Sequence, residues 1–192
     1  MATPMVKLTV LVDNNAKEGL VAEHGYSLWI ETGTRVLLFD TGNKNALKDN
    51  ASQLGKELSE IGTLILSHGH YDHTGGVETV LGQSKKAEIY LHQGAFQPRY
   101  VKDNGSARPV RVPGNSARAL DRFEERNRVH WATRPLWIDD NIGITGPIPR
   151  NNDFEDVGGD FFLDPGCSRP DLIEDDLALW IKTERGLVVC VG

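Results

Sequence analysis

Residues 67–76 constrain this chain more than any other segment, because they place four candidate metal ligands within six positions. The ligands are His68, His70, Asp72 and His73, and they come directly after the apolar run 64–66. Neutral imidazole nitrogen and carboxylate oxygen are donors that suit zinc, iron and manganese. A surface loop that is rich in histidine by chance is the alternative, but it does not explain this density of ligands. The segment therefore predicts a metal site at the end of a buried strand.

Length and composition are those of an ordinary globular domain. The chain has 192 residues, of which 39% are hydrophobic and 25% are charged. We therefore expect a single domain over residues 1–192 that buries a core of its own. Cys167 and Cys190 are too few and too far apart for a disulfide framework or a CxxC zinc site. We expect them to be free or buried thiols in a reducing compartment.

Charge and hydropathy argue against several classes of function. Residues 1–7 lack the pattern of a signal peptide, and no apolar window approaches the roughly 18 residues of a membrane span. We therefore expect a cytoplasmic protein without a membrane partner. The net charge of −6 argues against nucleic acid as a partner. Basic residues still dominate between Arg99 and Arg134; they form either a solvated face or a flap that binds a phosphate or carboxylate substrate.

Hydrophobic periodicity predicts strands first and strand–helix alternation later. Apolar residues at helical spacing predict a helix within residues 50–61. Gly, Pro, Asn and Arg indicate a loop over residues 97–115, and Ser116 is expected to cap a helix over 117–127. A short helix is expected over 77–81. The expected strands are 6–12, 27–32 and 35–40 around a turn at Gly33 and Thr34, 64–66, 87–92, and a C-terminal hairpin of 177–181 and 187–191. The pattern favours a sheet-rich α/β layered protein.

The position of the ligands after a strand predicts how they share the metal. His68 and His70 lie two residues apart in extended chain, so their side chains project to the same side. Asp72 and His73, at the start of a following helix, face a neighbouring position. This arrangement suits two ions a few ångströms apart that share a bridging water. A metal ion lowers the pKa of bound water from about 15.7 toward 7, which provides hydroxide at neutral pH.

Two motifs together resemble a known family. The order His68-x-His70-x-Asp72-His73, followed by Thr-Gly-Gly, resembles the ligand motif of the metallo-β-lactamase superfamily. Residues 39–42, Phe-Asp-Thr-Gly, are similar to a second element of that superfamily. One branch, the 7,8-dihydropterin-6-methyl-4-(β-D-ribofuranosyl)aminobenzene-5′-phosphate synthase-like branch of methanopterin biosynthesis, is similar in further segments. These are residues 11–14, 146–150, 153–155, 175–179 and 186–189.

The resemblance implies an αββα sandwich and a metal-dependent hydrolase, or a transferase of the synthase type, acting on a small-molecule substrate that is phosphorylated in the synthase-like branch. It implies two divalent metal ions, zinc in the first place, with manganese or iron as alternatives. His68 and His70 would bind the first ion, and Asp72 and His73 the second, with Asp72 also the catalytic residue. Asp40 would orient a ligand histidine from behind. Capping of the turn at the end of a strand is the alternative role for Asp40.

The chain departs from the family pattern at its end. Members of the family continue past a strand like 187–191 with a loop that carries another histidine ligand, and later a final one. Because the chain stops at Gly192, the resemblance implies a C-terminally incomplete fold, about half of the ligand shell, weak metal binding and an exposed apolar side. His92 and His130 stand in no matching context and are expected to pack or to cap. Asp175 and Asp176 are expected to be solvated.

Two other classes of function are weighed against the enzyme. A non-catalytic metal-binding or interaction module, built on a truncated scaffold, is the alternative hypothesis. A metallo-nuclease is a third, which the net charge disfavours. The sequence leaves the substrate-binding residues and the oligomeric state open.

Overall fold

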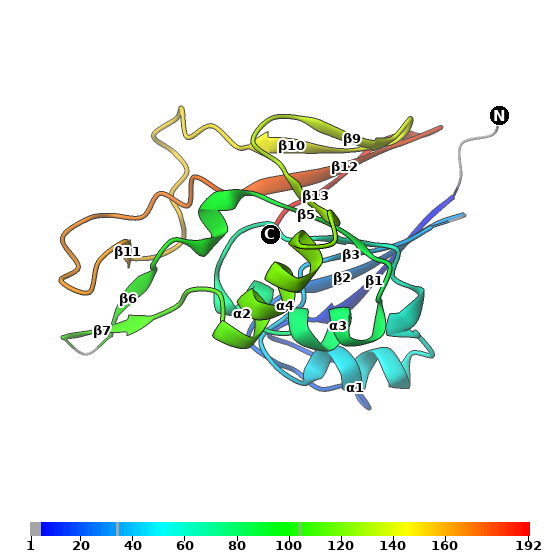
Figure 1. The fold of residues 1–192 in the computed structure, drawn as a ribbon, viewed down its shortest axis with the longest axis horizontal. Coiled ribbons are helices and arrows are strands. Elements are labelled where there is room, and N and C mark those ends of the chain that lie inside the picture. The colour runs from blue at the N-terminus through cyan, green and yellow to red at the C-terminus, as the bar shows by residue number, and fades with distance from the viewer. Residues whose placement is uncertain (1–4, 34, 104) are drawn as a thin grey trace.

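The computed structural model describes residues 5–33, 35–103 and 105–192. Two sheets pack face to face, and helices cover the outer face of the larger one (Figure 1). The expected sheet-rich α/β layered protein is therefore confirmed. Two of the sequence predictions, for Thr34 in the first hairpin turn and for the first four residues of the N-terminal stretch, lie outside the described residues.

The larger sheet joins an antiparallel meander to a set of parallel strands. β1, β2 and β3 pair antiparallel, and β4, β5 and β8 continue from β3 in parallel. The carboxyl ends of parallel strands meet at one edge of a sheet, so the loops after β3 and β4 become neighbours there. In the described ranges the order is β1-β2-β3-β4-β5-β8, with β1 (Val6–Val12), β2 (Ser27–Thr32), β3 (Val36–Phe39), β4 (Thr63–Ile65), β5 (Glu88–Leu91) and β8 (Val129–Trp131).

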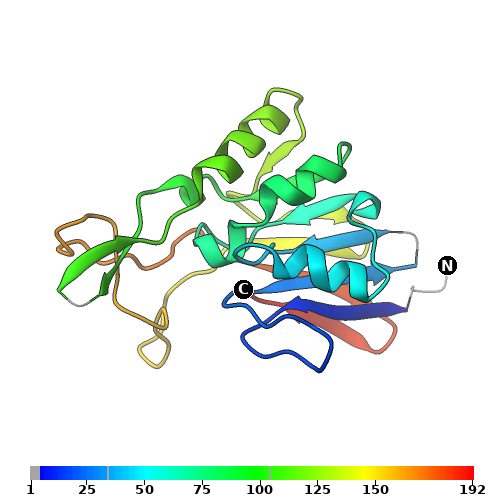
Figure 2. The same ribbon diagram turned by 90° about the horizontal axis from the view of Figure 1, so that it is seen from below.

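Helices α1 (Ala46–Gln53), α3 (Val77–Gln83) and α4 (Gly114–Glu124) cover one face of this sheet, as Figure 2 shows from below. Their apolar sides and the sheet enclose a core that contains Trp29 and Leu64. Burial of one such large apolar side chain stabilises the fold by about 1.5–3 kcal/mol. Within the described ranges, no helix combines the length and the apolar character needed to cross a membrane.

The smaller sheet packs on the opposite face of the larger one. It consists of β9 (Leu136–Asp139), β10 (Ile142–Pro147), β12 (Leu177–Thr183) and β13 (Gly186–Cys190), in the antiparallel order β13-β12-β10-β9. Alternate residues of β12 point inward, and Leu179 joins Ile30 and Phe39 in a second core between the sheets. The C-terminal hairpin is thus where the sequence predicts it.

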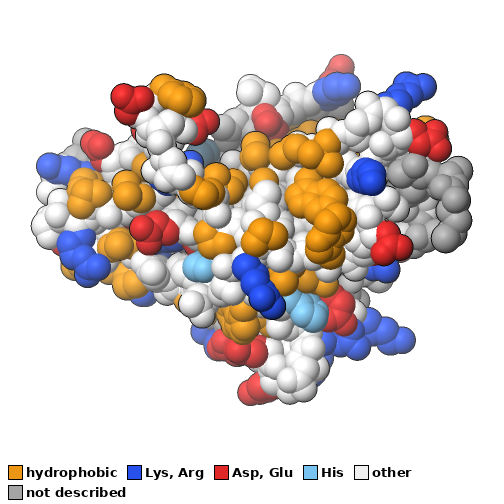
Figure 3. All heavy atoms as spheres, turned by 90° about the horizontal axis from the view of Figure 1, so that it is seen from above, with side chains coloured by type: hydrophobic (Ala, Val, Ile, Leu, Met, Phe, Trp, Pro, Cys, Tyr) orange, Lys and Arg blue, Asp and Glu red, His pale blue; other side chains and the backbone are white. Residues whose placement is uncertain are grey.

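The outer face of the smaller sheet carries exposed apolar side chains, as was expected for one side of the molecule. Trp137 on β9 is 65% exposed, and Leu187 and Val189 on β13 are 61% and 54% exposed. Figure 3 views this face and shows hydrophobic side chains gathered over it. Large exposed apolar areas on a soluble protein mark contact surfaces or aggregation risks.

A small third sheet corrects the prediction of a loop over residues 97–115. β6 (Tyr100–Asp103) and β7 (Ser106–Pro109) form a hairpin, and β6 also pairs with β11 (Phe161–Phe162). Gly105 adopts a φ of +83° in the hairpin connection, a conformation that glycine takes without steric cost. The partner strand β11 lies far away in sequence, so local composition does not reveal this pairing.

Two predicted helices are displaced. The predicted helix within residues 50–61 is replaced by α1, which ends at Gln53, and by a single 3-10 turn η1 (Leu58–Glu60). Gly55, with a φ of +63°, turns the chain between them. α4 begins at Gly114, so Ser116 lies inside the helix instead of capping it, and its hydroxyl donates to a backbone oxygen 3.4 Å away.

Candidate metal centre

The four candidate ligands lie in one short stretch at the carboxyl end of β4. His68 and His70 belong to the loop after that strand, and Asp72 and His73 lie in the first turn of helix α2 (Tyr71–Thr74). The neighbouring loop after β3 contributes Asp40. Two parallel strands thus deliver all five predicted site residues to one edge of the larger sheet.

The imidazole of His68 lies beside those of both His70 and His73. The ring centroid of His68 lies 4.6 Å from that of His70 and 4.2 Å from that of His73. His68 and His70 are 8% and 5% exposed. Among the described residues, Nε2 of His70 finds no hydrogen-bond partner. A buried nitrogen without a partner costs free energy unless something binds it, and a metal ion is a group that imidazole binds readily.

Asp40 lies fully buried against His73. Its Oδ2 is 2.7 Å from Nδ1 of His73, and because a carboxylate only accepts, the imidazole donates from Nδ1 and presents Nε2 outward. The same carboxylate accepts from the backbone N–H of Ser67 at 2.7 Å and from its hydroxyl at 2.6 Å. Asp40 adopts a φ of +60°, which aims its side chain at the site. The Asp40 carboxylate thus contacts His73 and the loop after β4. These contacts do not cap the turn at the end of β3, where the N–H of Gly42 donates to the carbonyl of Tyr26 instead.

Asp72 lies at the rim of the histidine cluster. Its Oδ2 is 3.8 Å from Nε2 of His73 and 3.3 Å from Nε2 of His24. His24 is mostly exposed and comes from the long connection between β1 and β2. Nothing in the sequence pattern around His24 distinguishes it from a surface histidine, so it was absent from the predicted site. The metal-binding and catalytic roles of Asp72 stay predictions.

Burial and neighbouring charge set the protonation of the histidines. Burial, with help from the other two imidazoles, holds the pKa of His68 well below its usual value, and burial lowers the pKa of His70 to about 3. Burial opposes the charged form of His73 as well, but the Asp40 carboxylate outweighs it and raises the pKa of His73. His68 and His70 are therefore neutral at pH 7, which is the form that binds a metal ion.

The ligands open into a cavity of about 330 Å³. Three charged residues outside the predicted site also line it: Asp156, Arg150, and Asp176, whose carboxylate pairs with the guanidinium of Arg150 at 2.9 Å. Burial raises the pKa of Asp176 to about 6 against the opposing effect of Arg150. The expectation that Asp176 is solvated is therefore wrong. The cavity lining consists of His68, His70, Asp72, His73, Arg150, Asp156, Val157, Gly158, Phe161, Ile173, Asp176 and Gly192.

Asp175 is also buried, against expectation, at 1% exposure. It contacts Arg99, which is likewise 1% exposed. Arg99 therefore belongs neither to a solvated face nor to an open flap, the two interpretations of the basic stretch. The sequence could not reveal this, because the two partners lie in distant segments and each looks like an ordinary surface charge.

His92 and His130 lie outside the cavity lining. Nδ1 of His92 accepts from the backbone N–H of Gly94 at the start of η2 (Gln93–Phe96), so this histidine caps a turn. His130 lies 2.8 Å from Glu88 and stacks on Tyr90. Both therefore pack or cap, as the sequence predicts.

The family is shown by a comparison with family models: the one described as the metallo-beta-lactamase superfamily matches residues 20–171. The chain belongs to this superfamily. The match contains all five predicted site residues. The predicted fold class, a metallo-beta-lactamase-like sandwich, is thereby confirmed.

Curated relatives place the chain near one branch of the superfamily. An uncharacterized protein of Methanocaldococcus jannaschii is 29% identical over 91% of this chain and 66% of its own length. The 7,8-dihydropterin-6-methyl-4-(beta-D-ribofuranosyl)-aminobenzene-5'-phosphate synthase of the same organism is 26% identical over 89% of this chain and 61% of its own length. The chain thus spans just under two thirds of the length of these relatives.

Solved structures of the superfamily share the fold. Tm1679, a metal-dependent hydrolase of the beta-lactamase superfamily, is 28% identical with a TM-score of 0.74, over 98% of this chain and 66% of that one. MEM-A1, a subclass B3 metallo-beta-lactamase from a soil metagenome library, is 13% identical with a TM-score of 0.52, over 98% of this chain and 60% of that one. The latter similarity shows the fold alone.

The four candidate ligands have donor atoms of the types that bind a divalent metal ion. Neutral His68 and His70, the outward Nε2 of His73 and the Asp72 carboxylate are donors that zinc and similar ions accept. The unpartnered Nε2 of His70 supports the same fit. In the described ranges, however, no group of three or more His, Cys, Asp or Glu side chains is arranged to hold one ion. The types of donor atom therefore suit a divalent ion, but among the described residues they are not arranged as a shell of three ligands around one ion.

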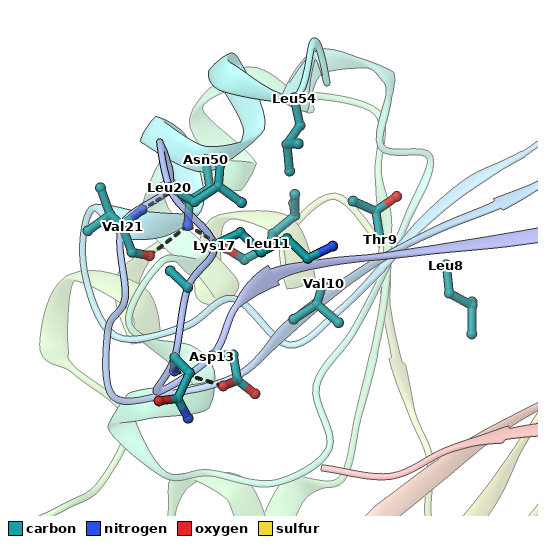
Figure 4. A pocket seen from close by; sticks show the side chains of 12 residues that line it. Leu8, Thr9, Val10, Leu11, Asp13, Lys17, Leu20, Val21, Asn50 and Leu54 are labelled. Carbon is teal, nitrogen blue, oxygen red and sulfur yellow. Dashed lines mark hydrogen bonds between the residues drawn. The ribbon is translucent and has the colours of Figure 1, made fainter.

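A second cavity lies away from the histidines, between β1, the loop that follows β1, and α1 (Figure 4). It measures about 490 Å³ and is lined mainly by apolar side chains such as Leu11 and Val21. The amide of Asn50 is fully engaged there, since it donates to the carbonyls of Leu11 and Val21 and accepts from the N–H of Val21. The polar groups of the Asn50 side chain are thus all used in hydrogen bonds within the fold.

Proposed function

We propose that this chain carries the metal site of a metal-dependent enzyme that hydrolyses or transfers a group of a small anionic substrate. One observation carries the proposal: at the wall of a cavity, the ring centroid of His68 lies 4.6 Å from that of His70 and 4.2 Å from that of the half-buried His73, and the buried His70 presents an unpartnered nitrogen. Membership of the metallo-beta-lactamase superfamily supports it. His68, His70, Asp72 and His73 would hold two divalent ions, zinc in the first place.

The chain's own residues prepare the site for this chemistry. A divalent ion bound here supplies Lewis-acid chemistry. Burial keeps His68 and His70 neutral, so their nitrogens need no deprotonation before they bind. Asp40 fixes the ring orientation of His73. Asp72, at the rim and beside His24, is the carboxylate placed to accept a proton from a reacting group.

Arg150 supports an anionic substrate. Its guanidinium reaches the cavity that the histidines line and pairs there with Asp176. Guanidinium groups bind phosphate and carboxylate through two parallel hydrogen bonds. A phosphorylated substrate would compete with Asp176 for Arg150, and protonation of Asp176, whose pKa is raised to about 6, would release Arg150.

The similarity to the synthase of Methanocaldococcus jannaschii supports a transferase of that type as the finer proposal. Such a condensation joins a dihydropterin, with pyrophosphate as the leaving group, to an aminobenzene ribosyl phosphate. Incubation of the metal-loaded protein with both substrates distinguishes the two activities. Release of pyrophosphate that requires the aminobenzene compound supports the transferase, and release without it supports a hydrolase.

Metal analysis tests the site itself. After incubation with zinc and removal of free ions, we expect between one and two ions per chain in the wild type, and a loss of at least about tenfold in affinity for Asp72→Asn. Asp121→Asn, an exposed acid on α4, is the matched control and should bind as the wild type does. Activity should fall in Asp72→Asn alone.

A non-catalytic metal-binding module is the second candidate, favoured by the finding that the described residues assemble no three-ligand group. Zinc binding without any turnover of phosphorylated substrates would support that module. Zinc content below about 0.2 ions per chain in the wild type would contradict both candidates.

A further inference from the structure

We infer that Asp175, held by the buried Arg99, is a positioning residue that fixes the loop carrying His68 and His70. The inference rests on the proposed function, because it concerns the geometry of the same site. Asp175 lies just before β12 of the smaller sheet, whereas the histidines follow β4 of the larger sheet. The contact therefore ties the two layers together at the candidate metal centre.

Asp175 contacts the loop at the residue between the two histidines. Its Oδ2 accepts a hydrogen bond from the backbone N–H of Gly69 at 2.9 Å. Two residues later, the N–H of Leu177 donates to the carbonyl of Ser67, also at 2.9 Å. The start of β12 thus holds the loop at two alternate positions, on either side of His68.

The loop has little room to move within this contact. A Cβ at Gly69 would lie 2.0 Å from the carbonyl oxygen of Ala95, so the backbone of η2 packs directly against it. On the other side, His70 forms an isolated bridge with Arg111. Removal of the Asp175 contact would therefore release the loop at Gly69, whereas the Asp40 carboxylate would still hold it at Ser67.

Arg99 explains why the carboxylate stays in place. Its Nη2 donates to Oδ1 of Asp175, its Nε lies 3.3 Å from Oδ2 of Asp171, and Nη2 is also 3.4 Å from the carbonyl of Gly94. All three charged side chains are at most 4% exposed. A buried charge cluster of this kind is seldom the most stabilising solution, since apolar residues of similar volume often stabilise as well or better. The hydrogen bond from Gly69 to Asp175 shows what this cluster does hold, which is the position of the loop.

The chemistry of the contact requires a carboxylate. Oδ1 accepts from Arg99 while Oδ2 accepts from Gly69, so both oxygens of Asp175 are engaged. An asparagine has one acceptor oxygen and would turn it to the guanidinium, because the charged donor forms the stronger hydrogen bond. The amide NH₂ would then face the N–H of Gly69, and that hydrogen bond would be lost.

Asp171 provides a matched control. Asp171→Asn also removes one negative charge beside Arg99. The amide oxygen that remains can still accept from the N–H of Ile173, as Oδ1 of Asp171 does at 2.9 Å. Asp171 makes no contact with the histidine loop among the interactions of the described residues. The two variants therefore share the damage to the charge cluster, and only Asp175→Asn loses the contact with Gly69.

The test combines amide hydrogen exchange with zinc titration. In the metal-free wild type, the Gly69 amide should exchange as slowly as amides of β4. In Asp175→Asn it should exchange at least about tenfold faster, and zinc affinity should fall about 10–100-fold, the usual effect of losing a group behind a ligand. Asp171→Asn should lower the unfolding midpoint as well, but leave Gly69 exchange and zinc affinity within about threefold of the wild type.

The outcomes separate this inference from the proposed function. If the wild type binds no zinc, the proposed function fails, while Gly69 exchange still tests the positioning role. If zinc affinity falls equally in both variants, Asp175 acts only through general stability and the inference is overturned. Fast exchange of Gly69 in the wild type would overturn it without any variant, so misfolding of Asp175→Asn leaves the inference testable.

Discussion

His70 makes stability depend on pH, because burial lowers its pKa in the folded protein to about 3 while the unfolded chain has the ordinary value of 6.5. Below pH 6.5 the imidazole of His70 is protonated in the unfolded chain but stays neutral in the folded protein. The free energy of unfolding therefore falls as the pH falls toward 3. From pH 7 to pH 5 this single group should remove about 2 kcal/mol from the free energy of unfolding. In His70→Gln the free energy of unfolding should not fall by this amount between pH 7 and pH 5. Urea unfolding with EDTA present, at both pH values, measures the difference.

The region above pH 7 provides the control for this prediction. There His70 is neutral in both states, so wild type and His70→Gln should change in parallel from pH 7 to pH 8. Parallel curves between pH 7 and pH 5 as well would show that the imidazole is not held neutral by burial.

At the scale of elements, the sequence predicted the strands and turns whose position depends on neighbouring residues in the chain. The strand before the ligands and the C-terminal hairpin are where their apolar patterns place them. The hairpin of β6 and β7 was not predicted because the Gly, Pro, Asn and Arg residues of this stretch indicate a loop, and the pairing of β6 with β11 joins segments distant in sequence. The same reason hides Asp175: it looks like a solvated acid until Arg99 and Gly69 are brought to it. The four candidate ligands could be recognised because they lie close together in sequence, whereas residues such as Arg150 lie far from them along the chain.

Close packing between elements gives a sharper test. Helix α2 lies against the loop after β3 so tightly that a Cβ at Gly75 would be 1.8 Å from the carbonyl oxygen of Asn43. Gly75→Ala should therefore destabilise the protein by about 1–3 kcal/mol and displace α2 with Asp72 and His73. Gly82→Ala, in α3 with nothing within 4 Å of the added Cβ, should stabilise it by about 0.5–1 kcal/mol. Thermal unfolding of both variants checks the contrast, and equal effects would contradict the packing.

At the scale of the whole molecule, the two sheets differ in what covers them. The central strands β2, β3 and β4 of the larger sheet are buried on both faces, by helices and by the smaller sheet. The smaller sheet is buried on its inner face and exposes Trp137 and Leu187 on the other (Figure 3). Stability therefore depends on the two cores, and the candidate metal centre lies at the edge where the layers meet.

Neighbouring valines of β13 test this asymmetry with one substitution. Val188 packs against the core between the sheets, whereas Val189 points outward and is 54% exposed. Threonine keeps the β-branched shape and replaces one methyl by a hydroxyl. Val188→Thr should cost about 1–2 kcal/mol, because the hydroxyl loses water without gaining a partner, and Val189→Thr should stay within about 0.5 kcal/mol. Chemical unfolding at low protein concentration measures both. A comparable loss in Val189→Thr would show that the outer face is covered in solution, by a second copy of the chain, and dilution would then remove the loss.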